Sequence, residues 1–513
     1  MANQFVTASR RLTRLFYFQV DKMAARTKAI WMSARYLQNG FAPINRLPPE
    51  ILGLIPSSFR SKRDLINATA VCRHWRNTLL SSPDLWSDVD CSGNMGPFRE
   101  YMFRECLERS RNVPLNVRLT SVRYLPDMTP HLLRFASLEI QLSVPEQLGK
   151  ITAYFSQPAP ILRKLSVVAA APWDRAGLSI PPGLFGGELA ALRSLRLTGF
   201  SVLKIPHHFP HLTHFDLQTR EYTSFGIDGI LQVLERMPSL EVLHVRFSST
   251  HELPLSPVTN PRLVTLSKLK EVELSSFDCL SIMPPCMPSL LFALTLPSVE
   301  RVAIGMLPPL DSLALPGSFE EQLPNFAETT TVNIHAGTGI FKISFHGRGE
   351  SRLFLSTNYC GVHSQFSRRG FRGMPFLSVK KLVVTVERFS PGVRGDLFGL
   401  LRAMERLEYL EIRGCCVHKM LSYLSERSKL DQQTICPSLQ RLVVAGRPHE
   451  TYSQLLAEFM EARVSRGAPL AETVEASPGM EEVSILWGGA TSSRVHGWSL
   501  HSSDSASQGW YKH

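Results

Sequence analysis

The chain has 513 residues, of which 44% are hydrophobic and 19% are charged, and its formal net charge is +12. This length exceeds what one compact core usually contains, so we expect several domains or an array of repeats. No stretch approaches the roughly 18 apolar residues of a membrane span, which argues against a membrane-spanning helix and leads us to expect no membrane partner.

The positive charge is concentrated near the N-terminus. Residues 1–50 contain eight Lys or Arg against Asp21 and Glu50, so their net charge of +6 is half of the total. We predict a basic arm over residues 1–43 that is flexible or loosely helical and that has a faint similarity to a mitochondrial transit peptide. The rest of the chain has no cluster of basic and aromatic residues on one element, which disfavours nucleic acid as a partner.

The chemically reactive residue types form no catalytic or metal-binding pattern. The nine cysteines are irregularly spaced without a Cys-x-x-Cys pair. This is typical of a reducing compartment, so we expect a cytoplasmic and/or nuclear protein. The histidine-rich stretch 207–214 is expected mostly in a loop, where solvated side chains are favoured over metal ligands. Because no P-loop, nucleophile elbow or zincin helix occurs, we predict no catalytic residue, no metal, no cofactor and no enzymatic activity.

The first predicted elements are three short helices. A Pro-Pro-Glu signal begins the first helix and Pro56 ends it within about two turns. Asp64 is expected to cap the second helix. The third helix is predicted over residues 68–80, with Cys72 inside and His74 in solvent, which argues against a Cys–His dyad. Its apolar stripe consists of Ala68, Val71, Cys72, Trp75 and Leu79.

Three segments of this region occur in a familiar order: LPPEIL from residue 47, VCRHWR from residue 71 and LW from residue 85. With these segments, the stretch from Ile44 to Asp88 resembles an F-box, and we assign residues 44–90 to one. The sequence departs from the family pattern at Ile55-Pro56, where an Ile-Phe or Ile-Leu pair is common. This departure shortens the first helix, which would lower the affinity for the family's partner.

The resemblance implies a docking module for the Skp-family adaptor of an SCF-type cullin–RING ubiquitin ligase. The same apolar side chains could instead only hold the helices together, and in a module of this size both roles are usually shared. The residues that correspond to adaptor contacts are Leu47, Pro48, Ile51, Leu52, Ile55, Val71, Cys72, Trp75, Leu85 and Trp86.

A repeating pattern follows a connecting helix and first strands, which are expected over residues 91–150. The pattern, apolar-x-x-apolar-x-apolar, begins at residues 162, 192, 212, 240, 269, 299, 379, 407 and 439. Six of the eight intervals lie between 28 and 32 residues, near the upper range of leucine-rich repeats. We therefore predict the α/β class: a short three-helix F-box followed by an irregular leucine-rich-repeat solenoid over residues 151–487, with parallel strands inside and helices and loops outside.

The longest interval contains an irregular, strand-rich segment at residues 306–375. Three stretches in it alternate apolar and polar residues, which indicates half-exposed strands, and residues 346–350 (HGRGE) indicate a hairpin loop. Irregular repeats and an inserted ribbon both fit this pattern. Residues 488–513 are rich in Ser and Gly, and we predict that they are disordered.

One face of the stacked strands is expected to be concave and lined by the residues between the core positions. Its side chains carry both signs of charge, which suits a protein partner better than nucleic acid. The residues expected on this face are Lys164, Arg196, His214, Asp216, His244, Arg246, Glu271, Glu273, Arg301, Lys381, Tyr409, Glu411, Arg413 and Arg441.

Together these features predict a substrate-recognition subunit of an SCF-type cullin–RING ubiquitin ligase. It would bind a Skp-family adaptor through the F-box and an unknown protein substrate through the repeats. It would act by raising the effective concentration of a substrate lysine near a ubiquitin-loaded enzyme. Two alternatives stay open: an interaction scaffold unrelated to ubiquitin, and a nucleic-acid-associated protein that uses the basic arm.

Overall fold

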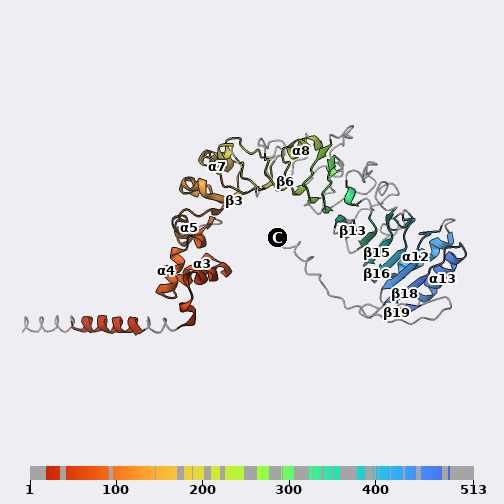
Figure 1. Cartoon of the computed structure of the whole chain (residues 1–513), viewed down its shortest axis with the longest axis horizontal. Helices are drawn as coiled ribbons and strands as arrows, with labels where there is room; N and C mark the ends of the chain where they lie inside the picture. The colour runs from red at the N-terminus through yellow and green to blue at the C-terminus, as the bar shows by residue number, and fades with distance from the viewer. Residues whose placement is uncertain are drawn as a thin grey trace, which may run out of the picture. The chain divides into compact units, whose positions relative to one another are not determined.

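The structure of the chain is a computed structural model, drawn in Figure 1. The predicted tail at residues 488–513 lies outside the described residues, and so does the predicted arm except for a helix at residues 19–34 and residues 42–43. The described residues are 19–34, 42–59, 61–91, 96–144, 146–169, 178–187, 189–200, 209–219, 226–247, 263–276, 290–291, 293–305, 323–326, 329–336, 340–347, 351–358, 378–387, 397, 400–402, 404–415, 417–430, 434–445, 452–476 and 483–485.

The chain divides into two compact units. The first contains residues 1–141 and 153–163, and the second contains residues 142–152 and 164–513. Most of the predicted connector, residues 91–150, therefore folds together with the helices that precede it.

Short helices make up the beginning of the first unit. The α-helices are α2 (Pro49–Leu54), α3 (Lys62–Thr69), α4 (Arg73–Ser81), α5 (Pro97–Arg109) and α6 (Leu125–Met128). The 3₁₀ turns are η1 (Pro43–Arg46), η2 (Ile55–Ser58), η3 (Pro83–Trp86), η4 (Val122–Tyr124) and η5 (Thr129–Arg134). The prediction that Asp64 caps the second helix is confirmed in part, because Asp64 takes part in the cap from the N3 position. Ser61 is the N-cap of α3, and its hydroxyl and the Asp64 carboxylate form a reciprocal capping box.

The helix predicted over residues 68–80 is two helices with a turn between them. Helix α3 ends at Thr69, and α4 begins only at Arg73, after Cys72 in extended conformation with φ −158°. Val71 lies in the turn and is 57% exposed, so the predicted stripe is broken there. The prediction that His74 faces solvent was also wrong, since it is half-buried with Nε2 3.4 Å from the carbonyl oxygen of Leu47.

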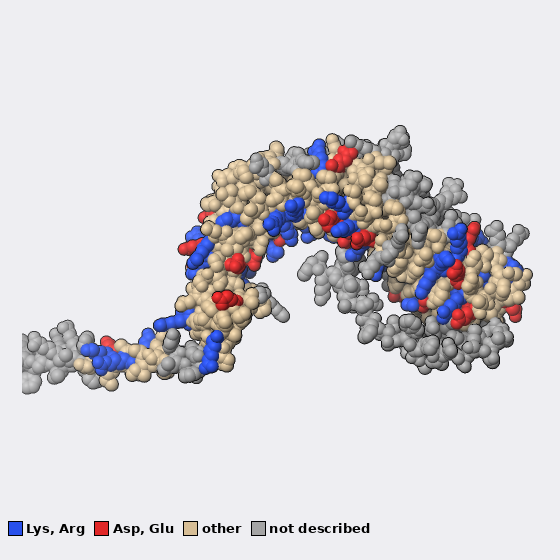
Figure 2. Space-filling model, viewed as in Figure 1, with Lys and Arg blue, Asp and Glu red and all other residues tan. Residues whose placement is uncertain are grey.

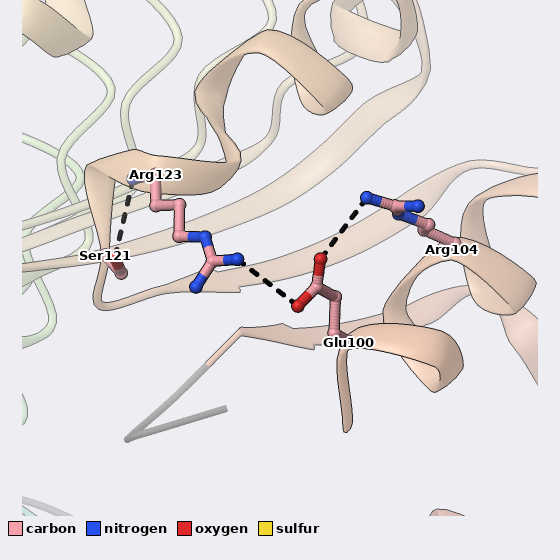
Figure 3. A network of polar contacts seen from close by, with 4 residues as sticks. All are labelled: Glu100, Arg104, Ser121 and Arg123. Carbon is pink, nitrogen blue, oxygen red and sulfur yellow. Dashed lines mark hydrogen bonds and ion pairs between the residues drawn. The ribbon is translucent and has the colours of Figure 1, made fainter. Parts of the chain in front are cut away.

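Three parallel strands continue the first unit: β1 (Asp88–Cys91) pairs with β2 (Leu115–Leu119), and β2 pairs with β3 (Phe135–Leu142). Helix α5 connects β1 to β2. Its Glu100 accepts hydrogen bonds from Arg104 at 3.2 Å and from Arg123 of η4 at 3.4 Å, as Figure 3 shows. Exposed ion pairs of this kind stabilise a fold by no more than about 1 kcal/mol, so the buried face of α5 is what holds it in place.

Each of the nine predicted patterns contains a strand that begins at its third residue. The first, fourth and sixth positions of every pattern are at most 5% exposed. These strands are β4 (Lys164–Ala169), β5 (Ser194–Thr198), β6 (His214–Thr219), β7 (Val242–Phe247), β9 (Glu271–Ser276), β11 (Arg301–Ile304), β15 (Lys381–Val386), β16 (Tyr409–Arg413) and β17 (Arg441–Ala445).

The strands β4, β5, β6, β7, β9 and β11 pair in parallel in this order. Equivalent positions lie directly opposite each other, so apolar residues form continuous rows. One such row is Leu165, Leu195, Phe215, Leu243, Val272 and Val302. Helices α7 (Glu146–Tyr154) and α8 (Gly226–Leu234), the turn η6 (Leu184–Gly187) and the two-stranded pair β8 (Val264–Thr265) and β10 (Leu294–Thr295) lie between strands along the chain.

An antiparallel ribbon of three strands interrupts the parallel series. Its strands are β12 (Thr331–Ala336), β13 (Ile340–His346) and β14 (Arg352–Asn358), preceded by η9 (Pro324–Phe326). Strand β14 pairs in parallel with β11, and β12 pairs in parallel with β15, so the order in the sheet is β11, β14, β13, β12, β15. Of the two possibilities left open by the sequence, the described part of residues 306–375 is therefore an inserted ribbon, with its chain order reversed in the sheet.

The C-terminal strands β15, β16, β17 and β18 (Glu472–Ala476) are parallel, and β19 (Val483–Ile485) is antiparallel to β18. Helices α12 (Val417–Leu430) and α13 (Tyr452–Val464) lie along one side of these strands (Figure 1). Their apolar residues, including Leu421, Leu424 and Phe459, are buried. The architecture is a mixed α/β fold with a large, mostly parallel sheet, in agreement with the predicted class.

Candidate protein-docking site

The helices of residues 43–86 are held together by a small apolar core. Leu52, Leu79 and Trp86 are almost completely buried, and Trp75 is 6% exposed. Both indole N–H groups have acceptors, because Trp86 Nε1 donates to the carbonyl oxygen of Leu79 at 2.9 Å and Trp75 Nε1 donates to Asn45 Oδ1 at 2.9 Å. A buried indole N–H without an acceptor would be costly, so both tryptophans are fixed in orientation.

Asn45 joins the segment before the first helix to the beginning of α4. Its side-chain oxygen accepts from Trp75 and also lies 3.7 Å from the thiol of Cys72, within reach of a weak hydrogen bond. The turn η1 is thereby fixed beside residues 72–75. Sequence reasoning missed Asn45, because a polar residue in a loop gives no sign of its distant partner.

Four large apolar side chains of this region are exposed to solvent, with exposed fractions between 45% and 65%: Ile44, Ile51, Leu54 and Val71. Ile51 and Leu54 are three residues apart on α2 and therefore share a face of the helix. Ile44 and Val71 each adjoin one partner of the Asn45–Cys72 side-chain contact, in which Sγ and Oδ1 lie 3.7 Å apart. We call these four residues the exposed apolar set.

The exposed apolar set can supply binding energy. Complete burial of a Val, Leu or Ile side chain is worth about 1.5–3 kcal/mol, so covering the exposed half of each contributes roughly 1 kcal/mol per residue. Only Ile51 and Val71 of this set were predicted as contacts from the sequence. Ile44 and Leu54 were missed, although Leu54 follows Ile51 at helical spacing.

The predicted adaptor contacts fall into three classes of burial. Ile51, Val71 and Pro48 are exposed, whereas Leu47, Ile55, Cys72 and Leu85 are half-buried. Leu52, Trp75 and Trp86 are buried, so they support the surface from below and are not part of it in this conformation.

The helical region is continuous with the strands of the first unit. Arg109 of α5 lies over the ring of Trp86 at 5.3 Å, and Lys62 donates to the carbonyl oxygen of Leu85 at 2.6 Å. Strand β1 follows directly and pairs with β2, where the Asn116 amide donates to Asp88 at 2.8 Å. A partner bound to the helices would therefore be held in a fixed geometry to the first strands.

Comparison with known families identifies this region. Residues 44–92 match the family model described as F-box-like. F-box domains generally bind Skp-type adaptors, so the F-box-like module makes the chain a candidate protein-interaction adaptor. A search of curated proteins finds no match to the chain. The matched range contains the predicted F-box and the whole exposed apolar set.

The sheet face predicted for substrate binding is a network of ion pairs in the second unit. Arg196 pairs with Asp216 of the next strand at 3.4 Å, and Arg246 pairs with Glu273 at 3.4 Å. Glu271 has two partners, His244 at 3.7 Å and Arg301 at 3.5 Å. His214 and Lys164 are exposed at the beginning of their strands. The structure thus places these predicted residues on one face, where most of them bind each other.

Tyr409 is the centre of a second polar cluster, on the C-terminal strands. Its ring lies between Lys381, at 4.7 Å, and Arg441, at 5.6 Å, and its hydroxyl donates to Glu411 at 3.0 Å. Figure 2 shows basic and acidic side chains next to one another over these strands. Glu411 is among the residues predicted on the substrate-binding face, but it is buried in this structure. Its carboxylate is buried and is already bound by Tyr409 and Arg413.

Metal-binding clusters and membrane-spanning helices are absent from the described residues. Within them, no group of three or more His, Cys, Asp or Glu could hold a metal ion. His207 and His208 of the histidine-rich stretch lie outside the described residues. Among the helices that the structure describes, none is long and apolar enough to cross a membrane. Burial raises the pKa of Cys106 to about 11 and that of Cys436 to about 12, so these thiols are poor nucleophiles at neutral pH.

Proposed function

We propose that the chain is the substrate-recognition subunit of an SCF-type cullin–RING ubiquitin ligase. The observation that carries the proposal is the F-box-like match over residues 44–92, together with an exposed apolar set on a well-packed core. The module docks a Skp-family adaptor and, through it, the cullin. The chain has no catalytic role of its own and works in the cytoplasm and/or nucleus.

The second unit supplies the target-binding part in this proposal. Its nine patterned strands are interpreted as a degenerate leucine-rich-repeat solenoid. The same positions are buried in each pattern, and equivalent residues of neighbouring strands lie opposite each other. The mechanism is positional. Binding of the target raises the effective concentration of its lysines near a ubiquitin-loaded enzyme that other subunits supply.

The experiment is a pull-down of a Skp-family adaptor with the full chain. Leu54→Asp/Val71→Asp places two charges in the exposed apolar set without touching the core. Loss of two apolar contacts at roughly 1 kcal/mol each corresponds to an about thirtyfold weaker complex. The matched control is Leu133→Asp/Val464→Asp, since these two side chains are similarly exposed, at 60% and 59%, but lie outside the module.

Binding that is lost only in the Leu54/Val71 variant, with an unchanged circular dichroism spectrum, supports the proposal. Absence of binding by the wild-type chain favours the alternative of an interaction scaffold unrelated to ubiquitin. One feature would then account for that result: α2 has only six residues before the 3₁₀ turn that contains Pro56. Equal losses in both double variants would mean that the exposed apolar set is not the docking surface.

A further inference from the structure

The ion pairs of the sheet face in the second unit are layered, with the basic groups outside. The exposed fractions are 50% for Arg196 against 22% for Asp216, and 45% for Arg301 against 30% for Glu271. The Arg246 side chain is 26% exposed, against 15% for its partner Glu273. A molecule that approaches this face therefore meets guanidinium groups first, while the carboxylates lie beneath them.

The charges on this face do not balance. The register of the strands from β4 to β15 places seven Lys or Arg on the face against three carboxylates, Asp216, Glu271 and Glu273. A fourth carboxylate, Glu387 directly after β15, pairs with His335 at 3.7 Å, so the difference is three positive charges. The basic residues are Lys164, Arg196, Arg246, Arg301, Lys342, Arg352 and Lys381. We call them the sheet-face cations.

The excess of positive charge is greatest where the inserted ribbon joins the parallel strands. Arg301 of β11 lies directly opposite Arg352 of β14, and like charges in this position destabilise a sheet. On its other side Arg352 faces His346, whose pKa is lowered by burial and by Arg352 itself. Among the described residues, no carboxylate forms an ion pair with Arg352 or Lys342. An anion bound here would relieve this repulsion.

We propose that the sheet-face cations bind an acidic, extended peptide segment of the target protein. The inference rests on the proposed function and names the substrate class of that site. From Arg196 on β5 to Arg352 on β14 there are five strand spacings, which is about 24 Å at roughly 4.8 Å each. An extended peptide that crosses the strands over this distance has about seven residues, and its Glu or Asp side chains form charge-assisted hydrogen bonds with the guanidinium groups.

The composition of the face favours a peptide over nucleic acid. The three carboxylates beneath the arginines repel a continuous phosphate backbone. A peptide carries separate carboxylates, which can lie next to the cations and away from these three carboxylates. Strands β4 to β11 also present no Phe, Tyr or Trp on this face in their described residues. The Phe354 ring on β14 already lies against Arg301, at 5.9 Å, so bases would have little to stack on.

The test measures fluorescence anisotropy of labelled probes with the full chain. The probes are a ten-residue peptide of alternating Glu and Gly, the matching peptide with Gln in place of Glu, and a ten-nucleotide oligo-uridine RNA. Arg301→Glu/Arg352→Glu is expected to weaken binding of the Glu peptide at least tenfold. The control, Lys150→Glu/Lys419→Glu, changes the net charge equally at exposed helix residues and is expected to leave binding unchanged.

Equal affinity of the wild type for the Glu and Gln peptides would overturn the proposal, and so would equal weakening in the two double variants. Tighter binding of the RNA, lost in the Arg301/Arg352 variant, would assign the face to nucleic acid instead. The adaptor pull-down is repeated with this variant and is expected to be unaffected. If the chain binds the Glu peptide but not the adaptor, only the ubiquitin-ligase function is refuted. If it binds the adaptor but not the Glu peptide, only the acidic-peptide site is refuted.

Discussion

Arg463 of α13 is the most informative single residue for testing the C-terminal fold, because a charged side chain of this size is only 1% exposed. Its guanidinium group donates to three backbone carbonyl oxygens of the segment before β17. The distances are 2.7 Å to Ile435, 3.1 Å to Cys436 and 3.3 Å to Leu439. Burial lowers the pKa of Arg463, so the charge is costly to bury and the three acceptors compensate for it.

Arg463→Met is expected to destabilise this region by about 3 kcal/mol. The substitution keeps most of the volume but leaves the buried carbonyl oxygens of Ile435 and Leu439 without their donor, at about 1–3 kcal/mol each, whereas that of Cys436 keeps the Leu439 N–H at 3.0 Å. Part of this loss is offset because a charge no longer has to be buried, which is worth several kcal/mol. Ile435 is the acceptor most affected, since its carbonyl oxygen receives the shortest of the three bonds, at 2.7 Å.

The measurement is hydrogen–deuterium exchange of residues 434–445 and 452–476 in the native protein. A loss of about 3 kcal/mol corresponds to a more than hundredfold faster exchange when opening of this region limits protection. Glu461→Met, an exposed change on the same helix, is the control and is expected to exchange like the wild type. Wild-type protection in Arg463→Met would refute the view that this arginine fixes the segment before β17.

Three further outcomes follow from particular contacts. Gly414 has φ +112°, and an added Cβ would lie 2.2 Å from a carbonyl oxygen of β15. Gly414→Ala should therefore destabilise the protein by about 2 kcal/mol or more, which differential scanning calorimetry would show as a lower melting temperature. Asn45→Ala removes the acceptor of Trp75 Nε1 and should cost about 1–3 kcal/mol in urea unfolding, whereas Asn45→Asp, which keeps the oxygen, should cost less. Burial lowers the pKa of His131 and His346, so the unfolded chain binds protons more readily below about pH 6.5. The melting temperature should therefore fall between pH 7.5 and 5.5, and less so in His131→Gln/His346→Gln.

Much of the second unit could be predicted because its information is local. In an apolar-x-x-apolar-x-apolar pattern, three side chains must leave water together, and a strand that begins at the third residue is the conformation that allows it. The ribbon at residues 331–358 marks the limit of this reasoning. Alternating residues predict its strands correctly, but which strands they join depends on contacts between distant residues, and no local pattern encodes the reversed order.

The errors near residue 70 have a different origin. A continuous apolar stripe from Ala68 to Leu79 fits one helix as well as two helices separated by a turn. In the structure Cys72 is extended and serves as the N-cap of α4, so the helix is interrupted between residues 69 and 73. The burial of Arg463 was missed, and Glu411 was expected on an exposed face, for a related reason. The burial of a charged residue is decided by partners that the local sequence does not name.

The F-box-like module illustrates why its sequence motif and its docking surface are different sets of residues. Trp75 and Trp86 are the most conspicuous residues of the pattern, yet both are buried and hydrogen-bonded within the module. A variant such as Trp75→Ala would unfold the helices, at about 3–5 kcal/mol, and would abolish adaptor binding whether or not the tryptophan touches the adaptor. Val71 and Leu54 have the opposite character, because their exposed side chains contribute little to folding and can be changed while the core stays intact. Only such surface variants can separate loss of an interface from loss of the fold, and the docking hypothesis depends on their outcome.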